Sequence, residues 1–343
     1  MTAAAAAPLR LGVLDQSPLS QGSDAVAALR GSVELARAAD RLGFARYWVA
    51  EHHDPQRYAG PSPEVLVGPI GLVTSRIRVG SGGVMLPHYS PRKVAESFAV
   101  LAGLLGDRVD LAVGRAAGTD DPALIHALQR DRRTPAPDDF AEQLDELLCY
   151  LDGRPPPDER FARLPPLPAG AEPWLLGSSP ASAVLAARRG LPYAYGEFIN
   201  PHDGAEAAEL YRRVFRRSAR LAAPRVAICV SAVCAATDAE ALRLAASARL
   251  AARLRRAGRL VALPPPDEAL RELRARDPEA AHRPGHTIAG CPERVRAGIE
   301  QRARRCGAEE ALVVTVTHDL DDRRRSYELL AGAFGLAAPD APR

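Results

Sequence analysis

The chain is almost free of lysine, and its charges nearly cancel. Lys93 is the only lysine among 45 cationic residues, and the formal net charge is +3. The arginines within 302–305 and 323–325 lie in helical patterns among acidic residues, which favours solvated helix faces over a nucleic-acid-binding surface. We therefore expect no nucleic-acid partner.

Paired cysteines and long apolar runs are also missing. The five cysteines, at positions 149, 229, 234, 291 and 306, show no CxxC spacing and leave one unpaired, which is typical of a reduced cytoplasmic protein. No stretch approaches the roughly 18 apolar residues of a membrane span, and MTAAAAAPLR lacks the features of a signal peptide. We expect a cytoplasmic protein without a membrane segment, a disordered leader at 1–8 and a tail at 336–343.

What the chain does have is an alternation of short apolar runs and amphipathic helical patterns. The runs are rich in valine, leucine and isoleucine, as in strands buried on both faces. Strict alternation with eight strands predicts one (β/α)8 TIM barrel over residues 9–335. The predicted strands are 9–16, 46–52, 77–86, 109–115, 173–177, 192–198, 225–235 and 311–317. The predicted helices include 25–42, 91–105, 140–151, 182–189, 205–220, 238–256 and 292–306.

Two regions interrupt this rhythm, at 115–139 and at 237–290, an insertion after the seventh strand. Such long connections lie at the C-terminal face of a barrel, where active sites are built. Within the insertion, 256–285 is rich in charge and proline and has few apolar residues to anchor it. It is therefore either a mobile lid or a disordered insertion. The proline-rich stretch 153–170 indicates an extended surface crossover.

The segment RYWVAEHH, 46–53, ends an apolar strand in ionisable side chains, Glu51, His52 and His53. Neighbouring strand residues face opposite ways, so His52 and His53 cannot point the same way while the strand persists. The pattern predicts one working imidazole and one structural one, and it argues against a two-histidine metal site.

Three further strand ends carry candidate binding groups. The glycines around Gly82 and Gly83 indicate either a β-bulge or bare backbone against which a flat ring can lie. Arg115 suits an anion such as phosphate, or a salt bridge at the rim. Serines 178, 179 and 182 open a helix, either as an anion site or as a plain N-cap. No GxGxxG dinucleotide fingerprint follows the first strand.

The order of these motifs resembles the bacterial luciferase-like flavin-dependent monooxygenases. RYWVAEHH, RIRVGSGGVMLPHYSPRKVAESFAVLAGLL and DRVDLAVGRAAGTD carry the likeness, which extends from GVLD at 12–15 to IAGCPE and RSYELLA near the end. The fold of that family is a (β/α)8 barrel, in agreement with the strand count. The resemblance implies a homodimeric enzyme that takes reduced FMN from a separate flavin reductase. With O2 it would form a flavin 4a-hydroperoxide and oxygenate a small organic substrate, for example in secondary metabolism.

The same resemblance assigns individual residues. His52 matches the active-site histidine beside the flavin, and we expect it to act as acid and base with a pKa near neutrality. Gly82 and Gly83 match a pair joined by a non-prolyl cis peptide under the flavin ring, and Arg115 matches a phosphate ligand. Gly114 replaces a cysteine of luciferase itself, and the glycine pair replaces larger residues, which puts light emission in question. The remaining expected cofactor contacts are Glu51, Ser81, Ser178, Ser179 and Ser182.

Three alternatives stay open. The first is a relative that uses a deazaflavin for hydride transfer, and the second is a non-catalytic flavin-binding protein. The third is a metal-dependent barrel hydrolase, which the adjacent histidines and the lack of an HxH pair on the first strand disfavour. Its candidate ligands would be His52, His53, His88, His202 and His318. We expect no metal.

Overall fold

The computed structural model describes residues 8–130, 138–154, 156, 170–277 and 285–336. The leader at 1–8 and the tail at 336–343 lie outside these ranges except for one residue each. Most of the expected crossover at 153–170 lies outside them as well, and so does 131–137 in the first long connection.

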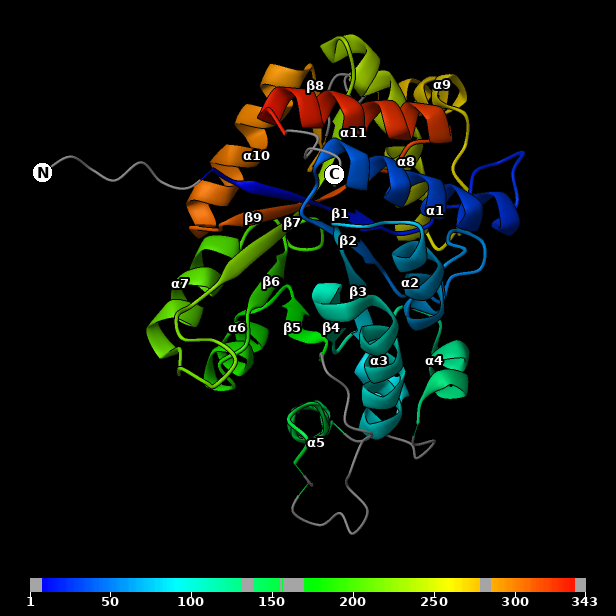
Figure 1. Cartoon of the computed structure of the whole chain (residues 1–343). Coiled ribbons are helices and arrows are strands. Elements are labelled where there is room, and N and C mark those ends of the chain that lie inside the picture. Colours follow the sequence, from blue (N-terminus) through cyan, green and yellow to red (C-terminus); the bar gives the residue numbers. More distant parts are fainter. Residues whose placement is uncertain (1–7, 131–137, 155, 157–169, 278–284, 337–343) are drawn as a thin grey trace, which may run out of the picture.

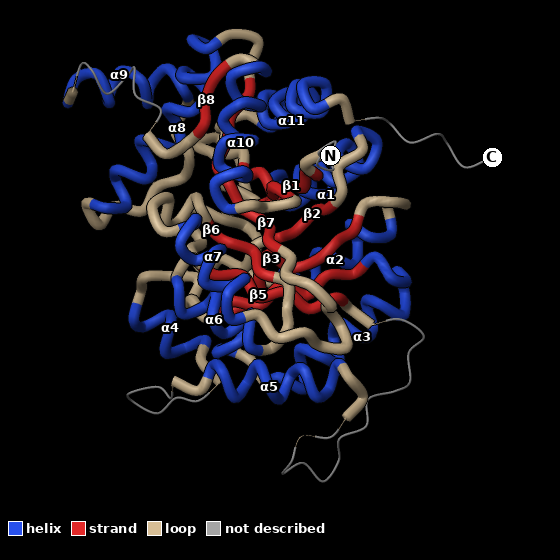
Figure 2. The backbone as a smooth tube through the Cα atoms, turned by 90° about the vertical axis from the view of Figure 1, so that its left-hand side faces the viewer, coloured by secondary structure: helices blue, strands red, loops and turns tan. Residues whose placement is uncertain are grey.

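Eight parallel strands close a barrel, which confirms the predicted (β/α)8 TIM fold. Neighbours pair in sequence order from β1 to β7, and β9 joins β1 to β7. Figure 2 shows the strands at the centre with helices around them. The barrel strands are β1 (Arg10–Asp15), β2 (Arg46–Val49), β3 (Arg78–Met85), β4 (Val109–Gly114), β5 (Glu172–Gly177), β6 (Tyr193–Gly196), β7 (Val226–Cys234) and β9 (Glu310–Val314).

Helices cover the outside of the barrel (Figure 1). α1 begins where the Asp24 side chain accepts a hydrogen bond from Ala27 N–H at 2.8 Å, and it ends at Gly43, whose φ of 86° favours glycine. Within the described ranges no helix is both long enough and apolar enough to cross a membrane. The helices are α1 (Ala25–Leu42), α2 (Pro63–Leu72), α3 (Pro91–Leu105), α4 (Pro122–Leu128), α5 (Phe140–Leu151), α6 (Pro180–Arg188), α7 (Gly204–Val214), α8 (Asp238–Arg256), α9 (Pro266–Arg276), α10 (Pro292–Cys306) and α11 (Leu320–Phe334), with short 3-10 turns at Leu86–His88 and Gly106–Arg108.

The predicted bounds of α1, α3, α5, α8 and α10 are confirmed, whereas α7 ends at Val214 and not at 220. Helices α2, α4 and α9 were not predicted, and for α11 the sequence indicated a helical pattern only around residues 323–325. The sequence of α2, PEVLVGPIGL, is apolar on nearly every side and contains Pro69 within the helix, so it shows no amphipathic period.

The inner layer of the barrel consists of residues from alternating strand positions. Trp48 and Trp174 meet edge to face, with ring centroids 5.4 Å apart. Along β2 the inward positions run from Arg46 through Trp48 to Ala50, and along β4 they run from Asp110 through Ala112 to Gly114. The inward side chains of these two strands therefore become smaller toward their C-terminal ends.

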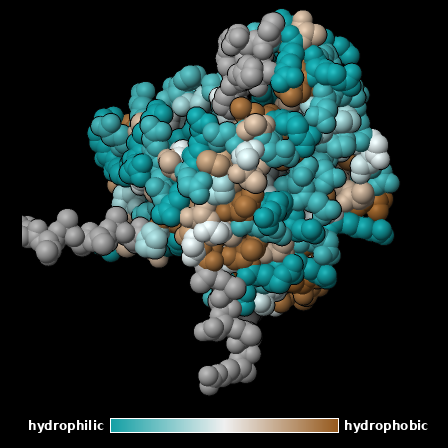
Figure 3. All heavy atoms as spheres, turned by 90° about the horizontal axis from the view of Figure 1, so that it is seen from above, coloured by the Kyte–Doolittle hydropathy of each residue, from teal (hydrophilic) through white to brown (hydrophobic). Residues whose placement is uncertain are grey.

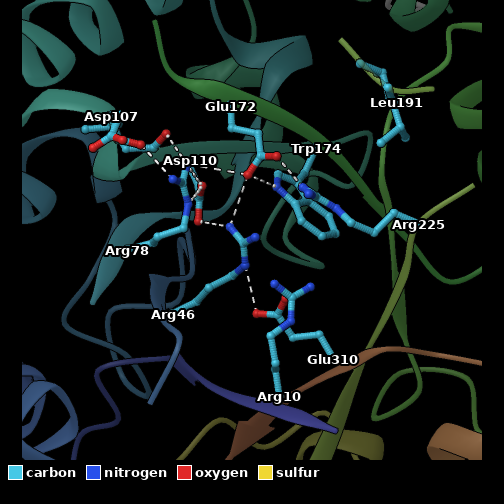
Figure 4. A network of polar contacts seen from close by, with 12 residues as sticks. Arg10, Arg46, Arg78, Asp107, Asp110, Glu172, Trp174, Leu191, Arg225 and Glu310 are labelled. Carbon is cyan, nitrogen blue, oxygen red and sulfur yellow. Dashed lines mark hydrogen bonds and ion pairs between the residues drawn. The ribbon is translucent and has the colours of Figure 1, made fainter. Parts of the chain in front are cut away.

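A network of buried ion pairs fills the opposite, N-terminal end (Figure 4). Arg46 lies at its centre, 2.5 Å from Asp110 and 2.7 Å from Glu310. Burial alone would raise the pKa of Glu172, but Arg46, Arg225 and Arg78 lower it to about 2. The guanidinium groups of Arg46 and Arg225 both lie over the Trp174 ring, with Cζ 4.7 and 4.4 Å from its centroid. The sequence patterns gave no sign of this network, which closes one end of the barrel and leaves the other for a ligand.

The insertion after β7 is better anchored than its composition indicates. Leu250 and Leu254 of α8 pack on Ala269 and Leu273 of α9, and all four are buried. Leu263 exchanges 2.8 Å backbone hydrogen bonds with Leu19 and Gln21 of the β1–α1 connection. Figure 1 shows α9 beside α8. The expectation that 256–285 lacks an anchor is therefore wrong up to residue 277, because Ala269 and Leu273 form an apolar stripe at helical spacing; 278–284 lie outside the described ranges.

The insertion also contains a short strand that was not predicted, β8 (Ile288–Gly290). It pairs in parallel with Ala232, Val233 and Cys234, the residues of β7 that extend beyond the barrel. Viewed from above, the surface of the molecule is largely hydrophilic with scattered apolar patches (Figure 3).

Candidate functional site

His52 follows β2 at the C-terminal end of the barrel. Its ring stacks on Tyr58, with centroids 4.3 Å apart and an interplanar angle of 23°. The Nε2 atom is shielded from solvent and has no hydrogen-bond partner among the described residues. A buried imidazole nitrogen without a partner is costly, and it marks the place where a bound molecule would supply one.

The pKa of His52 departs strongly from the sequence expectation. Burial, and then the positive charges of Arg57, His53 and Arg255, lower it from 6.5 to about 4. The expected pKa near neutrality is therefore wrong for the ligand-free protein. His52 is a neutral imidazole at pH 7, able to donate one hydrogen bond and accept one.

His53 and Glu51 belong to a separate, fully connected cluster. Glu51 Oε1 lies 2.7 Å from His53 Nε2 and accepts a hydrogen bond from Tyr89 OH at 2.8 Å, while Oε2 accepts from Met85 N–H at 2.9 Å. Burial and the Glu51 carboxylate raise the pKa of Tyr89. Glu51 is fully buried, so it ties the end of β2 to the end of β3 and has protein partners at both oxygens. His52 and His53 thus have different surroundings, one unpartnered and one hydrogen-bonded.

The glycine segment of β3 combines both structures that its sequence allowed. The Gly82–Gly83 peptide is cis, as the resemblance implied, and the pairing with β4 shifts register between Gly82 and Val84. A Cβ atom on Gly82 would lie 2.8 Å from Trp48 Cβ, and one on Gly83 would lie 2.7 Å from Ala112 O. The strand therefore presents bare backbone here because side chains do not fit.

Ser81 lies beside this glycine pair, but its hydroxyl is already engaged. Ser81 is fully buried and donates to Ala112 O at 2.8 Å. The side chain thus links β3 to β4, and its hydroxyl hydrogen is already donated within the protein.

Arg115 extends from the end of β4 into solvent. It makes no ion pair or side-chain hydrogen bond with any described residue, so the rim salt bridge that its position allowed is not formed there. The loop that follows is held in place. His53 N–H donates to Gly118 O at 3.0 Å, and His88 Nε2 lies 2.9 Å from Ala117 O. A free guanidinium on a fixed loop can bind an anion.

The serines after β5 divide into two roles. Ser179 is the N-cap of α6 and forms a capping box with Ser182, whose hydroxyl donates to Ser179 O at 2.7 Å and also lies 3.0 Å from Tyr193 OH. Ser179 and Ser182 therefore cap the helix, and their predicted contact with the cofactor stays a prediction. The Ser178 hydroxyl has no partner within the described part of the chain, and it stands at a helix start, where anions are favoured.

Several residues around His52 were missed by the sequence patterns, namely Arg57, Tyr58 and Arg255. Arg57 and Tyr58 lie in the loop after EHH, where no periodicity exists to place them, and Arg255 lies in the last turn of α8, whose position over the barrel depends on tertiary packing. No group of three or more His, Cys, Asp or Glu residues in the described ranges could hold a metal ion.

Known proteins are similar to this chain over nearly its whole length. The family model for luciferase-like monooxygenases matches residues 9–310. An Escherichia coli (strain K12) protein named luciferase-like monooxygenase is 35% identical over 327 residues, covering 94% of this chain and 96% of that protein. The crystal structure of apo-MsnO8 is 42% identical, with a TM-score of 0.87 over 98% of this chain and 99% of that one. The N-acetyl-S-alkylcysteine monooxygenase of Bacillus subtilis is 41% identical over 210 residues, or 60% of this chain and 62% of that protein.

Proposed function

This chain belongs to the luciferase-like monooxygenase family, and we propose that it uses reduced FMN and O2 to oxygenate a small organic molecule. The observation that carries the proposal is that one barrel end holds two groups without a hydrogen-bond partner in the described part of the chain, the buried Nε2 atom of His52 and the guanidinium group of Arg115. The first would meet the ring system of the cofactor, and the second would meet its phosphate.

The residues at this end fit FMN. Gly82 and Gly83 carry no side chain that would keep a flat ring from their backbone; Leu14, Trp48 and Ala112 fill only the side on which a Cβ atom would stand. A Cβ atom on Gly114 would meet Leu176 O and Met85 Sδ at ordinary contact distances of 3.6 and 3.8 Å. Arg115 and the Ser178 hydroxyl are the donors left free for a phosphate among the expected contacts. The other expected contacts position these groups. Glu51 and Ser81 hold the strand ends in place, and Ser179 and Ser182 hold the start of α6.

Reduced FMN, when bound, supplies two electrons, so that one oxygen atom of O2 is transferred to the substrate and the other leaves as water. The chain's own residues bind the cofactor and orient it. Arg115 and Ser178 hold the phosphate, and His52 holds or moves a proton at Nε2. Because its pKa is about 4, the imidazole begins as a neutral partner rather than as a charged acid. The α8–α9 insertion covers this barrel end and excludes water.

A separate flavin reductase supplies the reduced cofactor in this proposal, because the first strand lacks a dinucleotide-binding fingerprint. One relative is named an N-acetyl-S-alkylcysteine monooxygenase. S-alkylated N-acetylcysteines are therefore the first oxygen acceptors to test with this protein.

The exposed faces of α2 and α3 support a homodimer. Val65 and Leu72 of α2 lie seven residues apart, and Val100 and Leu104 of α3 lie four apart, so each pair shares a helix face. All four are more than half exposed, and the two helices are neighbours. We propose that a second copy covers this apolar surface. Leu72→Asp should then dissociate the dimer in sedimentation velocity, whereas Val26→Asp on α1 should leave it intact; a monomeric wild-type protein would refute the proposal.

The cofactor site is tested by anaerobic titration with reduced FMN and reduced riboflavin. A charge-assisted contact contributes about 1.5–3 kcal/mol, or roughly 10- to 150-fold in affinity. FMN should therefore bind more tightly than riboflavin, and Arg115→Ala should remove the difference. Arg217→Ala, at an exposed arginine in the loop after α7, should keep it. Equal binding of both flavins to the wild-type protein, or tighter binding of a deazaflavin, would overturn the proposal.

A further inference from the structure

Two arginines from segments far apart in the sequence approach the mouth of the barrel near His52. Arg57 lies in the loop after β2, and Arg255 lies in the last turn of α8. The β1–α1 connection joins the two segments. Leu19 N–H donates to Arg57 O at 2.8 Å, and Leu19 O accepts from Leu263 N–H at 2.8 Å. The loop that carries Arg57 and the chain that follows Arg255 therefore flank the same residue.

The Tyr58 ring links Arg57 to His52. Its Nη2 donates to Tyr58 OH at 2.9 Å, its Cζ lies 4.8 Å from the Tyr58 ring centroid, and Tyr58 stacks on His52. Its contact with Asp54 is long, at 3.5 Å. Most of its N–H donors thus remain available, while Tyr58 fixes the direction of the guanidinium group.

Arg255 approaches from the insertion. Its Nη1 lies 2.6 Å from Asp120 Oδ2, in a pair whose side chains are 44% and 82% exposed. Such exposed pairs contribute little to stability, so a bound anion can replace Asp120 at small cost. Asp120 lies two residues beyond Gly118, whose carbonyl accepts from His53 N–H at 3.0 Å. Arg255 therefore reaches toward the histidine pair across the loop after β4.

We propose that Arg57 and Arg255 bind a carboxylate of the organic substrate and hold its reacting group beside His52. Planar guanidinium groups match the geometry of a carboxylate and keep their charge at any physiological pH. The electrostatic surroundings agree, because the charges that lower the pKa of His52 after burial are all cationic. Arg115 is distinct from this pair, since it lies at the end of β4 and serves the cofactor. This substrate class rests on the proposed function.

The charge preference can be measured by titration calorimetry on the FMN-loaded protein. The probes are N-acetyl-S-benzylcysteine, 3-phenylpropanoate and octanoate, each paired with its uncharged primary amide. At least one acid should bind about 10-fold or more tightly than its amide, as a charge-assisted contact predicts. The preference should shrink in Arg57→Gln and in Arg255→Gln. It should persist in Arg253→Gln, an exposed arginine two residues earlier on a different face of α8.

Two results would overturn the inference. One is the absence of any acid preference in all three pairs, or a preference that survives the loss of both arginines. The other is a fall in FMN affinity in Arg57→Gln and Arg255→Gln as large as the fall in acid affinity, which would assign both residues to the cofactor. If the wild-type protein binds no FMN, the proposed function fails, and the acid preference is then measured separately on the apoprotein.

Discussion

His52 should titrate near pH 4 in the ligand-free protein. Its ring stacks on Tyr58, its Nε2 is shielded, and Arg57 and Arg255 add positive charge around it. Burial is the largest cause, so Arg57→Gln should raise the pKa only in part.

The size of the effect follows from the shift. Moving a pKa from 6.5 to about 4 corresponds to at most about 3 kcal/mol of difference between the two protonation states. In the unfolded chain His52 takes up its proton below about pH 6.5, whereas in the folded chain it does so only near pH 4. The unfolded state therefore binds more protons within this window. The contribution of His52 to stability is complete above pH 6.5 and is lost as the pH falls toward 4.

The assay is a titration of ¹⁵N-histidine-labelled protein by NMR. The chain has eight histidines, and His52→Gln identifies the signal that belongs to this residue. A midpoint near 4 agrees with a buried, cationic environment. A midpoint at about 6 or above would show that the ring is solvated or that an acid faces it, and the neutral-imidazole role would then be wrong.

Three other substitutions test the scaffold. Gly82→Ala places a Cβ 2.8 Å from Trp48 Cβ and should cost about 1–3 kcal/mol in urea unfolding, whereas Gly68→Ala in α2 meets only an ordinary contact and should not destabilise; equal effects would contradict the close approach. Arg46→Met strands the buried Asp110 and Glu310 carboxylates and should cost about 3–5 kcal/mol, far more than Arg10→Met, whose side chain is 48% exposed. Leu273→Ala should weaken the packing of α9 on α8 by about 2–5 kcal/mol while the barrel stays folded. The insertion should then be cleaved more readily in limited proteolysis, and more of the reduced flavin should end as hydrogen peroxide. An unchanged ratio of oxygenated product to hydrogen peroxide would show that the insertion is no lid.

The eight barrel strands could be predicted because strands buried on both faces appear as apolar runs that need no partner to be recognised. The same rule missed β8, whose three residues are too short to form such a run, and α2, whose apolar residues surround the helix. It also misjudged the anchor of α9, because the stripe of Ala269 and Leu273 is only two residues wide and stands among charged residues, and its partners Leu250 and Leu254 come from α8.

Of the candidate site, the backbone features could be predicted and the side-chain roles only in part. The glycine pair and the cis peptide follow from residue type and resemblance. The hydrogen bonds of Glu51, Ser81 and Ser182 depend on the neighbouring strand or helix, which no local pattern reveals. The pKa of His52 depends likewise on its burial and then on the charges of Arg57, His53 and Arg255, and the burial and the approach of Arg255 arise only through tertiary packing.

Oxygen transfer with bound FMN is tested most directly with ¹⁸O2. The wild-type protein, a flavin reductase, FMN and a panel of thioethers, ketones, aldehydes and amines would be incubated under ¹⁸O2, and products and hydrogen peroxide would be quantified together. We predict that at least one acceptor gains a single ¹⁸O atom and that peroxide falls as this product forms. Release of all reducing equivalents as hydrogen peroxide with every acceptor, or turnover only with a deazaflavin, would contradict a monooxygenase that depends on FMN.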